Sequence, residues 1–321
     1  MKTKILIVLI VIIALGAGGV FVYRNFFPKE IYKGVNMPTL TAVPYGDMWK
    51  PTLMDLDRAA ADGVNTLSFG PGFLVNKEGN VSLIGEKEFL ISFIEEAKAK
   101  GFKIRLTPGV IYSEKPIDFS KEPKGSSPIP PEVIENTDVM HNLDLVVIEW
   151  AKIAQEYKIE FFTPVGEPHF VLGIKEMRNW LPKIKPKIEA VFKGKMCLGE
   201  VEWNFPELSS YSCFAPCIEI PRNEEQEIEL VNKINRWYEE AKKQNIELMI
   251  GEIWSGPNWT GTKEDAQRGL AAAFEAGKGK VTGFFVLDTP HFPPPWDKLM
   301  TPIHIEDFED VLKEFYTSDL E

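Results

Sequence analysis

Short apolar stretches alternate with longer amphipathic stretches along most of the chain, and this alternation predicts its strands and helices. The short stretches predict eight β-strands, at residues 31–36, 64–70, 102–109, 159–165, 195–203, 211–220, 246–254 and 281–288. The amphipathic stretches predict helices at residues 51–63, 86–101, 143–157, 174–194, 224–245, 263–279 and 305–316. Pro182 and Pro186 are expected to interrupt the fourth of these helices, and Pro216 weakens the sixth strand.

The alternation of strand and helix predicts one α/β domain with a parallel sheet at residues 31–321. Eight such units in a chain of this length match a (β/α)8 TIM barrel. A doubly wound open sheet is the rival arrangement. No glycine-rich phosphate loop follows the first strand, which weakens that rival.

The first 23 residues are of a different kind, because no charged residue interrupts the apolar run from Ile5 to Tyr23. A helix of this length can span the hydrocarbon core of a bilayer, so residues 1–23 predict a membrane anchor, with residues 24–30 as a tether. A cleaved signal peptide, with secretion of the barrel, is the alternative, although the run is longer than a usual signal sequence. Both interpretations place the barrel outside the cell.

The composition limits the partners of this domain. Net charge is −11 overall, and the first 30 residues contain four basic residues and one acidic residue, so the remainder carries −14. An acidic domain repels phosphate backbones, which argues against nucleic acid as a partner. The three cysteines, Cys197, Cys213 and Cys217, are too few for a disulfide framework. One bridge and three buried thiols both remain open.

Carboxylates stand at the ends of two predicted apolar strands. Glu167 follows the fourth strand in "FTPVGEPH", and Glu252 ends the seventh in "LMIGEIW". The reactive groups of (β/α)8 barrels lie at the carboxyl ends of the strands, where these two would share one site. A charge at the end of a buried strand is costly unless it is paired or used. Two facing carboxyl groups are what glycoside hydrolysis requires, one as an acid and the other as an ionised base or nucleophile.

Three motifs, "GVNM" at the first strand, "GEP" after the fourth and "IGEIW" at the seventh, resemble those of the clan A glycoside hydrolases. The resemblance extends over about residues 31–290. It implies a retaining glycosidase without a cofactor, acting on β-linked oligo- or polysaccharide as a monomeric barrel. By the same resemblance, Glu167 is the acid/base and Glu252 the nucleophile.

Two departures from the clan keep alternatives open. The clan places Asn directly before its acid/base, where this chain has Gly166, and it often has a Tyr near the end of strand six, which we cannot place here. A carbohydrate-binding barrel without activity is therefore the second hypothesis. A metal-dependent hydrolase is the third and weakest, because the first strand has no His-x-His pair and no metal site is expected.

Further residues are expected to contact a sugar because they follow predicted strands. Five tryptophans fall there, and flat aromatic rings suit the faces of pyranose sugars: Trp49, Trp203, Trp254, Trp259 and Trp296. Trp150, Trp180 and Trp237 fall within helices and are expected to be packing residues. The other substrate-binding candidates are Asn36, Arg105, His169 and His291. Arg105 would either pair with Glu200 inside the barrel or tune Glu252, and the first of these is favoured.

Overall fold

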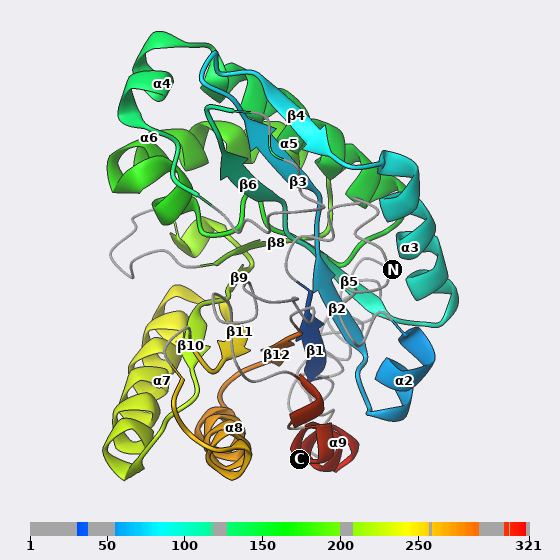
Figure 1. Ribbon diagram of the computed structural model, residues 1–321, viewed down its shortest axis with the longest axis vertical. Coiled ribbons are helices and arrows are strands. Elements are labelled where there is room, and N and C mark those ends of the chain that lie inside the picture. Colours follow the sequence, from blue (N-terminus) through cyan, green and yellow to red (C-terminus); the bar gives the residue numbers. More distant parts are fainter. Residues whose placement is uncertain are drawn as a thin grey trace, which may run out of the picture. The chain divides into compact units, whose positions relative to one another are not determined.

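Eight parallel strands form a closed barrel in the computed structural model, which describes residues 31–37, 55–115, 117, 127–199, 208–256, 259–288, 305–307 and 309–318 (Figure 1). The strands are β1 (Tyr32–Asn36), β2 (Thr66–Phe69), β5 (Lys103–Leu106), β7 (Phe161–Phe162), β8 (Lys195–Leu198), β9 (Cys213–Phe214), β11 (Glu247–Trp254) and β12 (Gly283–Leu287). Each pairs with its neighbour in this order, and β12 returns to pair with β1. All eight predicted strands and the predicted barrel are thereby confirmed.

The sixth strand of the barrel, which Pro216 was expected to weaken, is split into two parts. Its first part, β9, pairs with both β8 and β11. Its second part, β10 (Cys217–Glu219), pairs with β11 only. Proline lacks an N–H to continue the ladder, so the pairing stops and then resumes.

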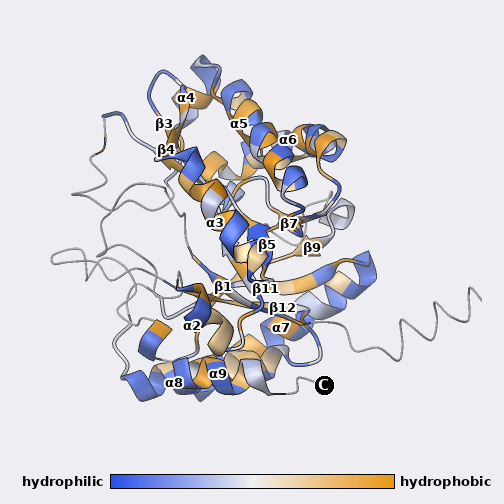
Figure 2. Cartoon of the chain, turned by 90° about the vertical axis from the view of Figure 1, so that its right-hand side faces the viewer, coloured by the Kyte–Doolittle hydropathy of each residue, from blue (hydrophilic) through white to orange (hydrophobic). Residues whose placement is uncertain are grey.

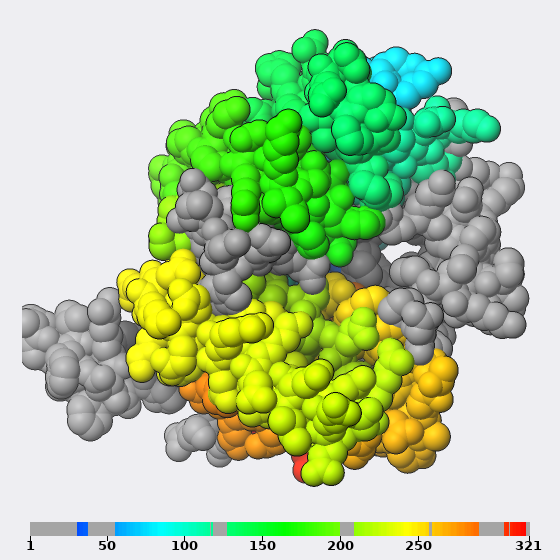
Figure 3. All heavy atoms as spheres, turned by 90° about the vertical axis from the view of Figure 1, so that its left-hand side faces the viewer, coloured from blue at the N-terminus to red at the C-terminus, as the bar shows by residue number. Residues whose placement is uncertain are grey.

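Helices follow the strands and cover the outside of the barrel (Figure 1). They are α2 (Leu56–Ala61), α3 (Lys87–Ala99), α4 (Pro131–Asn136), α5 (Val139–Glu156), α6 (Pro168–Val191), α7 (Glu224–Gln244), α8 (Lys263–Gly277) and α9 (Glu309–Thr317), with short 3-10 turns at η3 (Leu208–Ser210) and η5 (Ile305–Asp307). The hydropathy colouring of Figure 2 shows both apolar and polar residues along these helices, as expected of elements with one buried face. Figure 3 shows α6 in green and α7 in yellow-green on one face of the barrel.

The two prolines do not interrupt α6, which corrects the expectation from the sequence. Pro182 and Pro186 lie inside the helix, where Pro182 is half-buried and Pro186 is exposed. The carbonyls that lose a donor can therefore bond to water, while the buried side chains of Leu181 and Ile184 hold the helix on the barrel. The break in α6 is instead at Gly173, with φ 74° and ψ 154°, where helical geometry is lost after the first turn.

A second, three-stranded sheet was not predicted. It consists of β3 (Gly72–Val75), β4 (Val81–Ile84) and β6 (Gly109–Tyr112), in the order β4-β3-β6. Strand β3 begins three residues after the end of β2, and β6 begins three residues after the end of β5. The sheet therefore extends the barrel wall beyond the carboxyl ends of β2 and β5. Its four-residue strands are too short to show a period of their own in the sequence.

The inside of the barrel is filled by side chains from its strands. Its apolar part includes Phe161, Met249 and Phe285, with Ala215 and two cysteines, all at most 1% exposed. Residues 32–320 form one compact unit. No helix in the described ranges is long and apolar enough to cross a membrane, and the span predicted at residues 5–23 lies outside those ranges.

Candidate active site

Glu252 is presented by an irregularity in β11. The pairing of β11 with β12 gains one residue between Ile250 and Ile253, so Gly251 and Glu252 form a β-bulge. A Cβ atom at Gly251 would lie 2.3 Å from the Ala215 carbonyl oxygen, which only glycine avoids. Bulges beside active sites change the direction of a side chain. Here the bulge turns Glu252, which is half-buried, at the carboxyl end of the barrel.

Two side chains from other strands hold this bulge. The Nδ2 atom of Asn36, at the end of β1, donates a hydrogen bond of 2.7 Å to Oε2 of Glu252. Nη1 of Arg105, from β5, donates one of 3.0 Å to the carbonyl oxygen of Gly251. Charge-assisted hydrogen bonds of this kind position a carboxylate firmly. Asn36, expected to contact substrate, thus contacts the predicted nucleophile directly.

Arg105 lies almost entirely inside the barrel, at 4% exposure. Burial lowers the pKa of its guanidinium, whereas the nearby Cys217 and Glu252 favour its charged form. Cys217 pairs in register with Glu252 across β10 and β11. The structure therefore supports an influence of Arg105 on Glu252, the less favoured of the two roles considered from the sequence. The other role, a pair with Glu200, falls outside the described residues.

Glu167 lies in a tight turn between β7 and α6. Its backbone is left-handed, with φ 47° and ψ 51°, a region that costs free energy for residues other than glycine. The turn is held because Gly166 N donates to the Pro108 carbonyl at 2.7 Å, and the Glu167 carbonyl accepts from Phe170 N at 2.9 Å. A strained backbone maintained by its surroundings is typical of functional positions. Glu167 and Glu252 both lie at the carboxyl end of the barrel, as predicted.

Buried polar atoms gather at the same end of neighbouring strands. The hydroxyl oxygens of Ser68, Thr107 and Thr163 and the Nδ1 atom of His169 have no hydrogen-bond partner in the described part of the chain. Ser68 lies in β2, Thr107 directly follows β5, Thr163 directly follows β7 and His169 lies in the first turn of α6. Buried groups of this kind need an explanation, and a polar ligand or ordered water would supply one. The sequence indicated Ser68, Thr107 and Thr163 as site residues only through their positions at the ends of predicted strands.

The two described tryptophans of the predicted cluster differ in their surroundings. Trp254, the last residue of β11, is half-buried and follows Glu252 by two residues. Trp259 is 7% exposed, and its indole N–H donates to the Gly261 carbonyl at 2.9 Å. The placement of Trp259 favours packing over sugar contact. The helix residues Trp150, Trp180 and Trp237 are buried, which confirms them as packing residues.

The remaining predicted site residues cannot be placed. Trp49, Trp203, Trp296 and His291 lie outside the described residues, and their proposed roles stay predictions. Within the described ranges, no group of three or more His, Cys, Asp or Glu side chains is arranged to hold a metal ion.

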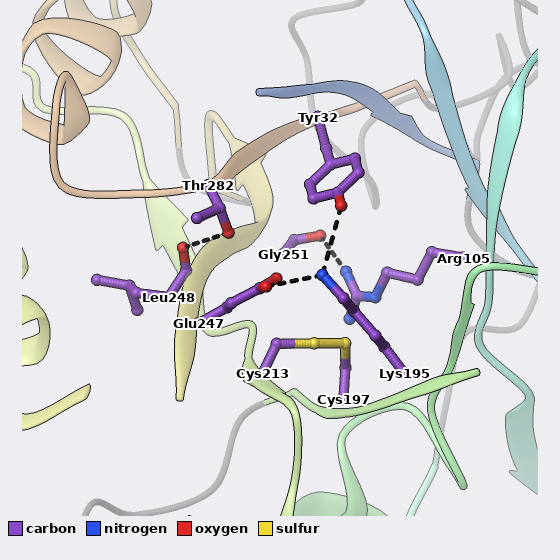
Figure 4. The surroundings of a disulfide bond; sticks show 9 residues. All are labelled: Tyr32, Arg105, Lys195, Cys197, Cys213, Glu247, Leu248, Gly251 and Thr282. Atoms are coloured by element: carbon purple, nitrogen blue, oxygen red, sulfur yellow. Dashed lines mark hydrogen bonds and ion pairs between the residues drawn. A yellow bond between two sulfur atoms is a disulfide. The ribbon is translucent and has the colours of Figure 1, made fainter. Parts of the chain in front are cut away.

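The opposite end of the barrel interior contains a different polar cluster (Figure 4). Nζ of Lys195 donates to Glu247 Oε1 at 2.7 Å and to the Tyr32 hydroxyl at 3.5 Å. Burial disfavours the charge of Lys195, but the hydrogen bond and charge of Glu247 outweigh it and raise the pKa of the ammonium group. These residues begin strands β8, β11 and β1, so they close the barrel at its base.

A disulfide joins Cys197 of β8 to Cys213 of β9 at the same level (Figure 4). The two residues are register partners, and both are 0% exposed. Cys217 takes no part in a disulfide. This decides between the alternatives that the sequence left open: one bridge forms and one thiol remains.

Three solved structures with the same fold are distant in sequence. A GH113 beta-1,4-mannanase matches with a TM-score of 0.68 and 15% identity, over 90% of this chain and 100% of its own. A glycoside hydrolase family 5 mannosidase from Rhizomucor miehei matches with a TM-score of 0.62 and 10% identity, over 89% and 92%. A GH5-4 broad specificity endoglucanase from Clostridum cellulovorans matches with a TM-score of 0.58 and 12% identity, over 90% of this chain and 99% of its own.

No protein-family model and no curated protein sequence matches this chain. At these identities, the structural matches establish a shared fold, and chemistry must be argued from the site itself. The chain has the (β/α)8 barrel that is also found in solved GH113 and GH5 glycoside hydrolases.

Proposed function

We propose that this protein is a retaining glycoside hydrolase that acts on β-linked oligo- or polysaccharide. The observation that carries the proposal is the bulge at Gly251 and Glu252, which aims a carboxylate from the end of β11 and fixes it through Asn36. A structural carboxylate would not require a glycine-dependent bulge and a buried arginine behind it. The glycoside hydrolases that share the fold add support.

In the proposed reaction, Glu252 is the nucleophile. Its carboxylate attacks the anomeric carbon while Glu167 transfers a proton to the glycosidic oxygen, so the leaving sugar departs as an alcohol. The covalent glycosyl-enzyme is then hydrolysed by a water molecule whose proton returns to Glu167. The positive charge of Arg105 favours the ionised form of Glu252 that attack requires. Asn36 orients the attacking group.

The proposed substrate is a neutral β-linked glycan. The matched structures are described as mannanase, mannosidase and endoglucanase, which supports this class of substrate. Trp254, two residues after Glu252, would supply an aromatic ring, and Nδ1 of His169, two residues after Glu167 and without a partner in the described part of the chain, would supply a polar contact. Trp49, Trp203, Trp296 and His291 remain candidates for further contacts.

A carbohydrate-binding barrel without hydrolysis is the second candidate, and Gly166 favours it. The clan that the sequence resembles has an Asn at this position. A Cβ atom at Gly166 would lie 3.3 Å from Thr107 Cγ2 and 3.5 Å from the Pro108 carbonyl oxygen, so a side chain fits after a small adjustment. Replacing Gly166 with Asn should therefore increase turnover if the missing amide limits hydrolysis.

We also propose that the barrel lies outside the cell, anchored by residues 1–23 or secreted after their cleavage. The buried disulfide between Cys197 and Cys213 supports this location, because such bonds persist in oxidising compartments. Protease treatment of intact cells tests it. Degradation of the barrel without lysis is expected, and protection until lysis would contradict the proposal.

Screening residues 31–321 on a panel of β-linked glycosides and polysaccharides tests the function. At least one substrate should be cleaved with retention of configuration. Glu252→Ala should lower kcat about 10⁴-fold or more, and azide should restore part of the activity. Glu247→Gln, on the same strand but at the base, is the matched control and should retain kcat.

Each alternative has its own outcome. Sugar binding without turnover across the panel would favour the binding barrel. Activity that a chelator abolishes would favour a metal-dependent hydrolase instead.

A further inference from the structure

The base of the barrel is rich in lysine although the chain as a whole is acidic. The base connections are defined here as residues 62–66, 98–103, 156–160, 193–195, 242–247 and 278–282, which lead from a helix into the next strand. They contain ten lysines and four acidic residues, whereas the net charge of the chain is −11. The base connections therefore carry a net charge of +6, against −17 for the rest of the chain.

Helix direction accounts for part of the basic charge at the base. We call the carboxyl end of the barrel strands the mouth and the opposite end the base. Every helix that follows a strand in a parallel barrel starts at the mouth and ends at the base. The negative ends of these helix dipoles therefore lie at the base. Acidic residues occupy the first turns of α7 and α8, whereas the first turns of α5 and α6 have none. Lys242 and Lys243 occupy the last turn of α7 and Lys98 that of α3, whereas the last turns of α5, α6, α8 and α9 have no basic residue.

Part of the basic charge at the base is available to a partner. Lys98, Lys100 and Lys195 form ion pairs with Glu160, Asp57 and Glu247. Lys158, Lys193, Lys242 and Lys278 are exposed and form no ion pair within the described residues. They come from four different connections around the barrel, so the free charge is spread over the base as a surface.

The chain enters the barrel at this same end. Strand β1 starts at Tyr32 at the base, and the tether of residues 24–30 directly precedes it. A membrane anchor at residues 1–23 therefore leads to the basic end and not to the mouth.

We propose that the base connections bind the surface of an anionic phospholipid bilayer, so that the mouth points away from the membrane. The orientation rests on the anchor proposed above, whereas the binding rests on the lysines alone. Each lysine near an anionic bilayer adds a modest attraction, which a tether strengthens by holding the barrel close to the lipid. A long nucleic acid fits less well, because the net charge of −11 would repel it.

Co-sedimentation of residues 31–321 with vesicles tests the surface without the anchor. This fragment is suitable because residues 32–320 form one compact unit, and the matched mannanase structure is covered over its full length. Binding to vesicles with about 30% phosphatidylglycerol should exceed binding to phosphatidylcholine alone at least about fivefold, at about 0.05 M salt. About 0.5 M salt should abolish the difference, because the attraction is screened.

Charge reversal of three exposed base lysines, Lys158→Glu, Lys193→Glu and Lys278→Glu, should lower vesicle binding at least about fivefold. The matched control reverses three exposed lysines outside the base connections: Lys77, Lys175 and Lys263. It should retain binding within about twofold. Equal binding to both vesicle types, or an equal loss in the two triple variants, would overturn the proposal. Glycoside hydrolysis, measured on the same variants, should be unchanged, so this proposal and the proposed function can fail separately.

Discussion

The mouth and the base of the barrel use the same kinds of residue in opposite ways. At the base, Lys195 donates to Oε1 of Glu247 and to the Tyr32 hydroxyl, although Oε2 of Glu247 has no partner among the described residues. A disulfide joins two neighbouring strands beside this cluster. At the mouth, Glu252 lies on a bulge and Glu167 in a left-handed turn. Several buried hydroxyls there have no partner among the described residues.

This difference separates stability from function within one fold. The ion pair of Lys195 with Glu247 and the disulfide at the base join neighbouring parts of the barrel, which stabilises the fold. Groups at the mouth are held by strained or irregular backbone, which costs stability and fixes their direction. We therefore expect mouth variants to change kinetics with little effect on unfolding, and base variants to do the reverse.

After Glu252→Ala, the largest effect is expected at the mouth, from Glu167→Gln. Loss of the proton donor should lower kcat by about 10²–10⁴-fold on substrates with a sugar leaving group, because that oxygen leaves poorly as an anion. Aryl glycosides with acidic leaving groups should lose much less. Glu176→Gln, later in α6, is the control. Equal losses on both substrate types would rule out the acid role.

The next largest effect is expected on stability, from the double variant Cys197→Ala and Cys213→Ala, which removes the disulfide. The bond closes a loop with a sequence separation of 16, which corresponds to about 3 kcal/mol of unfolding free energy. Urea denaturation should show this loss, while kcat at a temperature below the transition stays near its original value. A large fall in kcat in the folded variant would show that the two ends are not independent.

A smaller kinetic effect should follow Asn36→Ala, which removes the bond to Glu252 Oε2. A hydrogen bond to a charged group contributes about 1.5–3 kcal/mol, so kcat should fall about 10- to 100-fold with a small change in KM. Asn65 provides the comparison at the base, where its Oδ1 accepts from Lys33 N at 2.8 Å. Asn65→Ala should lower the free energy of unfolding and leave kcat unchanged. A fall in kcat for Asn65→Ala, with kcat unchanged in Asn36→Ala, would contradict the separation of stability at the base from function at the mouth.

The smallest effect concerns Asp62, a buried base residue. Burial, followed by the hydrogen bond and charge of Glu309, raises the pKa of its carboxyl group to about 6, from 3.8. The folded state then retains a proton that the unfolded state has released. The resulting stability is present below about pH 3.8 and is lost as the pH rises through about 6.

Asp62→Asn removes this titration. The free energy of unfolding of the variant, minus that of the original protein, should be about 1–2 kcal/mol larger at pH 7.5 than at pH 4. Urea denaturation at the two pH values measures this. Asp57→Asn, at an exposed position paired with Lys100, serves as the control and should show no such gain. A gain that does not depend on pH would point to packing instead of titration.

Much of this architecture follows from local pattern. The eight strands, most helix positions and the carboxyl-end location of Glu167 and Glu252 follow from alternating hydrophobicity, because each apolar stretch must be buried by its neighbours. The sheet formed by β3, β4 and β6 could not be predicted, since four-residue strands show no clear period. The predicted interruption of α6 at Pro182 and Pro186 was wrong, because burial of one face of the helix outweighs the loss of two backbone hydrogen bonds.

The sequence by itself determined the fold class, the order of the elements and the end of the barrel at which two carboxylates stand. The tertiary structure decided which groups meet: Asn36 with Glu252, Arg105 with the Gly251 carbonyl, and Cys197 with Cys213. These partners lie far apart in the chain or on separate strands, and their contact depends on the closure and register of the barrel. Local periodicity specifies how a segment folds, but only closure brings distant segments to the same place.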